Sequence, residues 1–132
     1  MRYGIDPATL LLIADSGLAV DPTHSLVAPN SILPDLLTTL LGEVRRGERT
    51  EKDALAVHTR ATETKIRLLG DRVSRRTAWN LAREHDWADL RDAEYLAVTK
   101  LQADALVTPD TRLTALASGI VEVAAPEVLS RG

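Results

Sequence analysis

The sequence contains no cysteine and no phenylalanine. Without cysteine, the chain can form neither a disulfide framework nor a thiolate metal site, and it offers no cysteine nucleophile. Aromatic residues make up only 3% of the chain. We therefore expect the two tryptophans, Trp79 and Trp87, to lie in the core or at a partner interface rather than to stack on nucleic-acid bases.

Long hydrophobic runs are also missing. Asp, Pro or Gly interrupts each apolar stretch well before the roughly 20 residues that a membrane span requires. The N-terminal segment reaches an acid at Asp6, which is too early for a secretory signal. We therefore expect a soluble, cytoplasmic protein with no contact with a membrane.

An excess of positive charge is missing as well, since the formal net charge is −3. A sequence-independent RNA binder usually carries a basic excess, so an RNA site here would have to be a local basic patch. Two arginine clusters are candidates, although such clusters are more often a solvated helix face: Arg45, Arg46 and Arg49, and Arg72, Arg75 and Arg76.

Several catalytic motifs are absent too. The chain has no Gly-x-Ser-x-Gly nucleophile elbow, no Walker loop and no dinucleotide-binding Gly-x-Gly-x-x-Gly. Enzyme classes that depend on these motifs are therefore disfavoured.

The 132 residues suffice for one continuous core, and segments typical of strands alternate with segments typical of helices. Strands are predicted at residues 2–5, 25–28, 65–69, 105–107 and 120–123. Helices are predicted at 8–16, from a cap at Asn30 or Ser31 to about 46, and at 51–64, 72–84, 88–102 and 110–117. This order predicts a single α/β domain over residues 1–132, with a central parallel sheet of four to five short strands flanked by helices on both faces.

Four aspartates are candidates for a site. Asp6 and Asp110 directly follow predicted strands, at the edge where open parallel sheets place their sites. Asp35 and Asp92 lie near helix beginnings. Carboxylates that converge there would repel one another unless a cation joined them, and Mg²⁺ or Mn²⁺ are the hard cations that prefer oxygen ligands.

Each aspartate also has a purely structural interpretation. Asp6 and Asp110 could cap the helices that follow them. Asp35 could complement a helix dipole, and Asp92 with Asp89 could be ordinary acids of a helix N-terminus. The placement of two acids after strands nevertheless favours a converging site.

Two stretches resemble the PIN-domain family, and within it the VapC-type toxins. One is Asp92-Ala93-Glu94-Tyr95-Leu96-Ala97, and the other is Leu106-Val107-Thr108-Pro109-Asp110-Thr111-Arg112-Leu113. The opening Tyr3-Gly4-Ile5-Asp6 is similar to the first strand and aspartate of that family. Further similarity covers Ala28-Pro29 with Asp35, Val44–Gly47 and Ile66–Val73, so that it extends over nearly the whole chain.

The resemblance implies a PIN fold and a Mg²⁺- or Mn²⁺-dependent endoribonuclease. In its terms Asp6, Asp92 and Asp110 would hold the principal ion, and Asp35 would steer the attacking water or a second ion. Thr108 matches a residue that supports the fourth acid. Asp89 is a lesser site candidate, and Arg72, Arg75 and Arg76 would meet RNA phosphates at the rim of the site. The family also implies a homodimer and a cognate VapB-type antitoxin.

Two positions depart from the family pattern. The second acid is Asp35, where the family usually has glutamate, and aspartate is one methylene shorter. The first motif lacks its usual hydroxyl, because Ala8 stands in that place and Thr9 points about 100° further around a helix.

Two alternatives stay open, and the departures favour the first of them. The chain could be a catalytically weak or inactive PIN-like binding module. It could also be a PIN nuclease that processes RNA outside toxin–antitoxin systems.

Overall fold

The computed structural model describes all 132 residues, in which strands alternate with helices. The first half contains β1 (Arg2–Ile5), α1 (Pro7–Ser16), β2 (Ser25–Pro29), α2 (Ile32–Arg45), α3 (Glu51–Thr62) and β3 (Arg67–Leu69). The second half contains α4 (Arg72–His85), α5 (Arg91–Gln102), β4 (Ala105–Val107), α6 (Thr111–Ala117), β5 (Val123–Ala124) and the 3₁₀ helix η1 (Pro126–Ser130). None of the helices is long and apolar enough to cross a membrane.

The five strands form one parallel sheet in the order β3-β2-β1-β4-β5, which confirms the predicted fold class. The first strand, β1, lies at the centre and pairs with β2 on one side and β4 on the other. Ile5 at the end of β1 stands opposite Val107 at the end of β4. The chain segments that follow these two strands therefore begin side by side.

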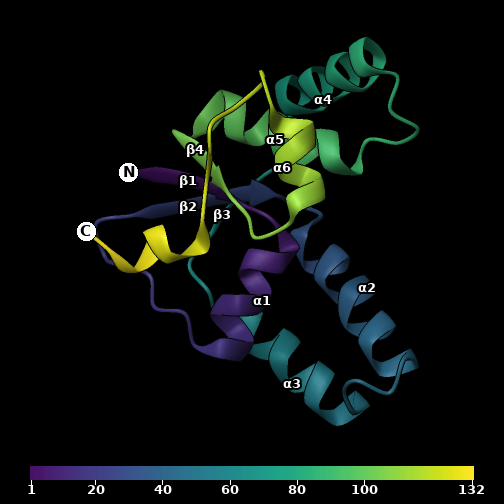
Figure 1. Ribbon diagram of the computed structural model, residues 1–132, viewed down its shortest axis with the longest axis vertical. Coiled ribbons are helices and arrows are strands. Elements are labelled where there is room, and N and C mark those ends of the chain that lie inside the picture. The colour runs from purple at the N-terminus through teal and green to yellow at the C-terminus, as the bar shows by residue number, and fades with distance from the viewer.

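Helices cover both faces of the sheet (Figure 1). On one face, β-strand residues such as Ile5 pack with α1, α2 and α3 in a core of 16 buried residues. On the other face, Leu106 packs with α4, α5 and α6 in a core of nine buried residues. In Figure 1, the purple-to-teal helices α1–α3 lie below the sheet and the teal-to-green helices α4–α6 lie above it.

The helix boundaries follow local capping chemistry. Side chains of Asp6, Thr50, Asp71 and Asp110 each accept a backbone N–H at the start of a helix. Gly17 ends α1 in the left-handed conformation at φ 70°. Ser31, a predicted cap of α2, makes no capping hydrogen bond. Its hydroxyl donates instead to Glu94.

Four predicted boundaries were wrong by two or more residues. Helix α3 ends at Thr62 instead of residue 64. The third strand begins at Arg67 instead of residue 65. Helix α5 begins at Arg91 instead of residue 88, because Asp89 accepts the Arg91 N–H in a turn before the helix. The last strand covers only Val123–Ala124, because the N–H groups of residues 120 and 121 bond back to Ala117 at the end of α6.

The position predicted for Trp79 in the core or at an interface is wrong for the core, since 55% of Trp79 is exposed. The buried stripe of α4 consists of small or aliphatic side chains, namely Ser74, Ala78, Leu81 and Ala82. These positions satisfy helical spacing without the tryptophan. Trp87 is half-buried and stacks on the His85 ring.

Candidate functional site

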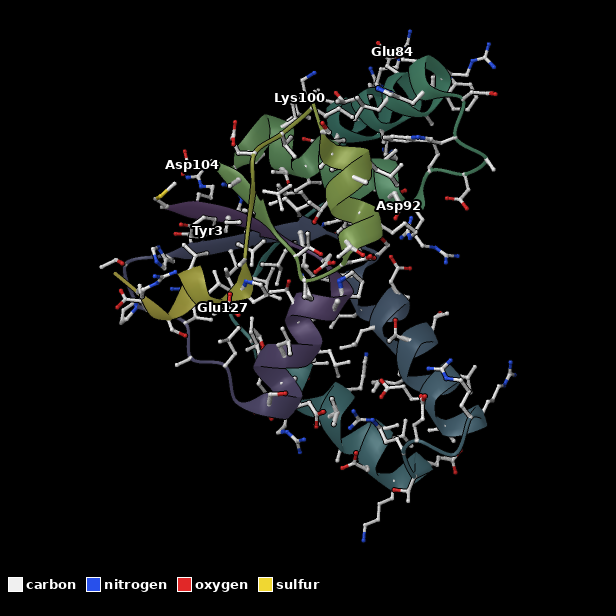
Figure 2. All side chains as sticks on the ribbon, in the orientation of Figure 1. Tyr3, Glu84, Asp92, Lys100, Asp104 and Glu127 are labelled. Carbon is white, nitrogen blue, oxygen red and sulfur yellow. The ribbon has the colours of Figure 1, made fainter.

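The four aspartates selected from the sequence line one pocket of about 210 Å³. Asp6 follows β1, and Asp110 lies three residues after the neighbouring strand β4. Asp35 and Asp92 belong to the first turns of α2 and α5. Figure 2 shows Asp92 where the upper and lower groups of helices meet. The pocket is thus at the carboxyl edge of the sheet, where such folds bind ligands.

Asp6 is the most deeply buried of the four, with 3% of its surface exposed. One carboxylate oxygen accepts the Thr9 N–H at 2.9 Å, and the other accepts the Thr108 hydroxyl at 2.6 Å. Burial raises the pKa of the Asp6 carboxyl above its ordinary value, and these hydrogen bonds partly offset the rise. Asp6 therefore caps α1 and also belongs to the pocket.

Thr108 connects the first and fourth aspartates. Its hydroxyl donates to Asp6 and accepts the Asp110 backbone N–H at 2.9 Å. Asp110 in turn caps α6 by accepting the Arg112 N–H at 2.8 Å. A single buried hydroxyl thus fixes the loop after β4 against the carboxylate after β1.

Asp35 has a partner that the sequence analysis missed. The Tyr95 hydroxyl donates to an Asp35 carboxylate oxygen at 2.7 Å. Burial and the hydrogen bond to Asp35 raise the pKa of Tyr95, so the phenol remains protonated as a donor. The spacing of Asp92 and Tyr95, three residues apart on one helix, was the available signal that both face the same pocket.

Asp92 forms a bidentate ion pair with Arg112, which the sequence analysis also missed. The two guanidinium nitrogens lie 2.7 Å and 3.0 Å from the two Asp92 oxygens. The same guanidinium lies 3.6 Å from an Asp110 oxygen. These carboxylates, with Asp92 first, raise the pKa of Arg112.

The donor set suits a hard divalent cation, because the four acids around the pocket offer only carboxylate oxygens. The four carboxylates lie further apart than the ligands of an occupied metal site do. No three His, Asp or Glu side chains are close enough together to hold an ion. Each acid is instead engaged by a donor of the protein itself.

The two residues that depart from the family pattern, Ala8 and Asp35, both line the pocket. Ala8 lines it without supplying a hydroxyl. Thr9 does not replace that hydroxyl, because its side chain is fully buried and donates to the Val107 carbonyl at 2.8 Å. Asp89, the lesser candidate, is exposed and does not line the pocket.

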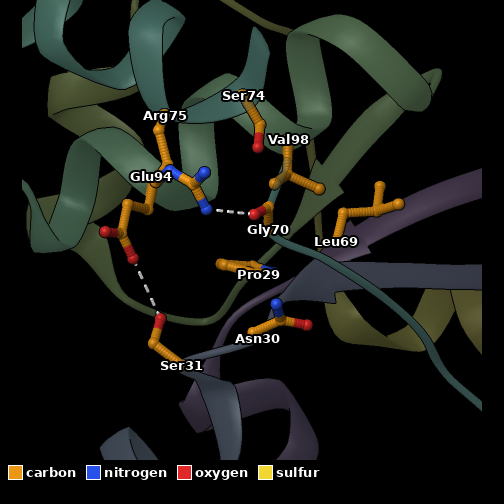
Figure 3. A pocket seen from close by; sticks show the side chains of 9 residues that line it. All are labelled: Pro29, Asn30, Ser31, Leu69, Gly70, Ser74, Arg75, Glu94 and Val98. Atoms are coloured by element: carbon orange, nitrogen blue, oxygen red, sulfur yellow. Dashed lines mark hydrogen bonds between the residues drawn. The ribbon is translucent and has the colours of Figure 1, made fainter. Parts of the chain in front are cut away.

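The predicted RNA-contacting arginines lie elsewhere, on the exposed face of α4. This face, which we call the α4 basic face, consists of Arg72, Val73, Arg75, Arg76, Thr77 and Trp79. Arg75 also lines a second pocket of about 190 Å³ at the ends of β2 and β3, where its guanidinium donates to the Gly70 carbonyl and Glu94 accepts from Ser31 (Figure 3). This second pocket shares no lining residue with the acidic pocket.

The chain is thus an α/β protein with a parallel five-stranded sheet, helices on both faces and four acids at the carboxyl edge of the sheet. No family model and no curated protein matches the sequence. Solved structures do match it. PAE2754 from Pyrobaculum aerophilum is 22% identical with a TM-score of 0.66, covering 98% of this chain and 95% of the other.

Two further matches are named as VapC or VapBC proteins. VapC20 of Mycobacterium tuberculosis is 20% identical, with a TM-score of 0.58 over 92% of this chain and 98% of the toxin. VapBC-1 of nontypeable Haemophilus influenzae is 14% identical, with a TM-score of 0.61 over 96% and 98% of the two chains. The chain therefore has the fold of the VapC-type toxins, over their full length.

Proposed function

We propose that this protein is a metal-dependent endoribonuclease and the toxin component of a type II toxin–antitoxin system. The observation that carries the proposal is the gathering of Asp6, Asp35, Asp92 and Asp110 around one pocket, in a chain with the fold of VapC-type toxins.

In this proposal Asp6, Asp92 and Asp110 hold Mg²⁺ or Mn²⁺, and Asp35 orients the attacking water or a second ion. A bound cation would lower the pKa of a coordinated water and neutralise charge that develops on the scissile phosphate. The chain's own residues prepare the acids for this role. The Thr108 hydroxyl orients Asp6, and the Tyr95 hydroxyl orients Asp35.

The α4 basic face is the proposed site of contact with RNA. Arg72, Arg75 and Arg76 are exposed beside Trp79, whose side chain is also exposed. Cations bind phosphates, and an exposed indole can stack on an unpaired base.

A VapB-type antitoxin is the proposed partner, because one structural neighbour is a VapBC protein. Leu37, Leu41 and Leu55 on α2 and α3 are each at least 39% exposed. Such apolar surface is suited to coverage by another chain, either the antitoxin or a second copy in a homodimer.

The decisive experiment is cleavage of a structured RNA pool by the purified protein with Mg²⁺ or Mn²⁺. VapC20 is described as cleaving the sarcin–ricin loop, so an RNA of that loop belongs in the pool. Discrete cuts that disappear with EDTA and in Asp6→Asn support the proposal. Asp86→Asn is the matched control, because Asp86 lies in the exposed turn after α4 and does not line the acidic pocket.

The second candidate is a PIN-like binding module without catalysis. The open spacing of the acids and the missing hydroxyl at Ala8 favour it. Binding of RNA or of a partner without cutting under any metal, by folded protein free of antitoxin, would select this candidate.

A third role, RNA processing outside toxin–antitoxin systems, is separated by genetics. Growth arrest on expression that is relieved by the product of an adjacent small reading frame supports the toxin. Cleavage without growth arrest supports processing.

A further inference from the structure

The side chain of Arg112 lies across two of the four pocket acids. Its nitrogens make two contacts of 2.7 Å and 3.0 Å with Asp92, and one nitrogen is 3.6 Å from Asp110. The planar guanidinium fork matches a carboxylate edge to edge. Both oxygens of Asp92 are therefore occupied while the ion pair stands.

Arg112 forms every ion pair that the pocket acids make. Arg91 also lines the pocket but pairs with no carboxylate. The acids need compensation, since the side chains of Asp92 and Asp110 are only 27% and 35% exposed and Asp6 is buried beside them. Arg112 is thus the counter-ion that the chain itself supplies to its acidic pocket.

The guanidinium can leave the pocket without disturbing the core. The side chain of Arg112 is 62% exposed, and it begins in the first turn of the short surface helix α6. Ion pairs with such an exposed partner are weak. A divalent cation, which attracts each carboxylate more strongly than a single positive charge does, can replace it.

We propose that Arg112 competes with the divalent cation for Asp92 and Asp110. Without the cation, Arg112 holds the two carboxylates in the pocket. When the cation binds, the guanidinium turns outward into solvent, so the ion's affinity is lower than the acids alone would give. This inference rests on the proposed metal site.

The test is titration of the full chain with Mn²⁺ in a calorimeter. Arg112→Gln removes both the competitor and a repelling charge, so Mn²⁺ should bind about fivefold more tightly, equivalent to ~1 kcal/mol. The Mn²⁺ affinity of Arg112→Lys should lie between those of the wild type and Arg112→Gln, because an ammonium is a point charge that cannot pair with both oxygens of Asp92 as a guanidinium does. Arg91→Gln is the matched control, because it removes an equal charge from the pocket rim without breaking an ion pair. The Mn²⁺ affinity of Arg91→Gln should differ from that of the wild type by less than about twofold.

A second measurement follows Arg112 itself. The Nε–H signal of Arg112, assigned by its loss in Arg112→Gln, should shift toward the position of a solvated guanidinium as Mg²⁺ saturates the pocket. The same signal should stay in place when Mg²⁺ is added to Asp6→Asn, which lacks a proposed ligand.

The outcomes separate this inference from the proposed function. Equal Mn²⁺ affinity in the wild type, Arg112→Gln and Arg91→Gln overturns the role of Arg112 and leaves the metal site standing. Folded protein that shows no saturable Mn²⁺ binding in any variant overturns the metal site, and the competition with it.

Discussion

At the scale of single residues, Asp6 shows how one short side chain serves two purposes. One oxygen caps α1 and the other accepts from Thr108, and Asp6 lines a pocket together with three further acids. Burial raises the pKa of Asp6, so the ionised carboxylate is a cost to the cation-free fold. Functional sites commonly carry such a cost in stability.

Asp6→Asn should therefore stabilise the cation-free protein by about 1 kcal/mol near pH 7. Asparagine is uncharged, and its carbonyl can still accept the Thr9 N–H. Because the pKa of Asp6 is raised in the folded protein, its protonation stabilises the folded wild type below the ordinary aspartate pKa. This stabilisation is lost as the pH rises through the folded-state pKa. The gain from Asp6→Asn should accordingly shrink toward about pH 3. Urea unfolding in EDTA between about pH 3 and pH 7 measures this difference in the free energy of unfolding.

The control for Asp6→Asn is Asp86→Asn, at an exposed position. Its effect on the free energy of unfolding should not follow this pH profile. A constant difference between Asp6→Asn and the wild type at every pH would contradict the burial argument.

At the scale of helices, Arg49 joins three elements of one layer. From the loop between α2 and α3 it reaches Asp15 of α1 at 2.9 Å, Glu43 of α2 at 3.2 Å and Asp53 of α3 at 2.6 Å. Its side chain is only 12% exposed. The other oxygen of Glu43 is buried without a partner, so removal of Arg49 would leave that carboxylate without a hydrogen bond or an ion pair.

Arg49→Ala should lower the free energy of unfolding by about 2–3 kcal/mol, less than for a fully buried pair because Asp15 and Asp53 reach solvent. The hydrogen bond from Arg49 lowers the pKa of Asp15. This part of the stability is therefore present above the ordinary aspartate pKa and is lost as the pH falls through the lowered value. Urea unfolding near pH 7 and near pH 3 checks both statements.

Arg46→Ala is the matched control for Arg49→Ala. The Arg46–Glu48 pair is exposed on both sides, at 61% and 52%. Its loss should change the free energy of unfolding much less than the loss of Arg49 does, because solvent screens an exposed pair. A similar loss for both variants would refute the role given to Arg49.

The contact between β1 and α5 depends on a missing side chain. A Cβ at Gly4 would lie 2.1 Å from the Thr99 hydroxyl oxygen and 3.2 Å from the Thr99 Cβ. Gly4→Ala should destabilise the protein by about 2–3 kcal/mol through overpacking, and Thr99→Ala should recover part of that loss in the double variant.

Gly42→Ala is the contrasting case. Only the end of the flexible Arg46 side chain lies near Gly42, so the helix should gain about 0.5–1 kcal/mol of stability. Thermal unfolding of the wild type, Gly4→Ala, Thr99→Ala and their double variant measures the coupling, and Gly42→Ala is measured beside them.

At the scale of the whole molecule, the net charge of −3 hides an uneven distribution. Arg72→Glu with Arg76→Glu should weaken RNA binding in EDTA and reduce the dependence of log K on log salt by about 1.4. Fluorescence anisotropy from about 50 to 200 mM salt measures this dependence. Arg45→Glu with Lys52→Glu makes the same change of charge where α2 ends and α3 begins. These two helices lie at the opposite end of the molecule from α4 (Figure 1), so the effect should be smaller. Equal effects would argue against a specific α4 basic face.

Much of this architecture could be predicted from the sequence, because strand-helix alternation leaves few options besides a covered parallel sheet. The neighbouring positions of Asp6 and Asp110 also follow, since both succeed strands of that sheet. The partners Tyr95 and Arg112 could not be predicted in the same way. Each reaches its acid across an interface between helices, at 60 and 20 residues' separation, and such contacts depend on how helices pack.

The core position predicted for Trp79 was wrong for a different reason. The scarcity of aromatic residues favoured a position in the core or at a partner interface, but the buried stripe of α4 consists of Ser74, Ala78, Leu81 and Ala82, and Trp79 is exposed. Local pattern indicates that a helix has a buried face, while the width of that face is set by its neighbours.

The central place of β1 in the sheet has a consequence for synthesis on the ribosome. The strand made first pairs with β4, and Asp6 bonds Thr108 across 102 residues of chain. At about 5–20 residues per second, translation takes roughly 5–20 s to cover that interval. Throughout it the nascent chain carries Asp6 but not the loop that completes the pocket. Whatever this pocket does is therefore withheld until the loop after β4 has been made, which gives a partner translated nearby the time to arrive first.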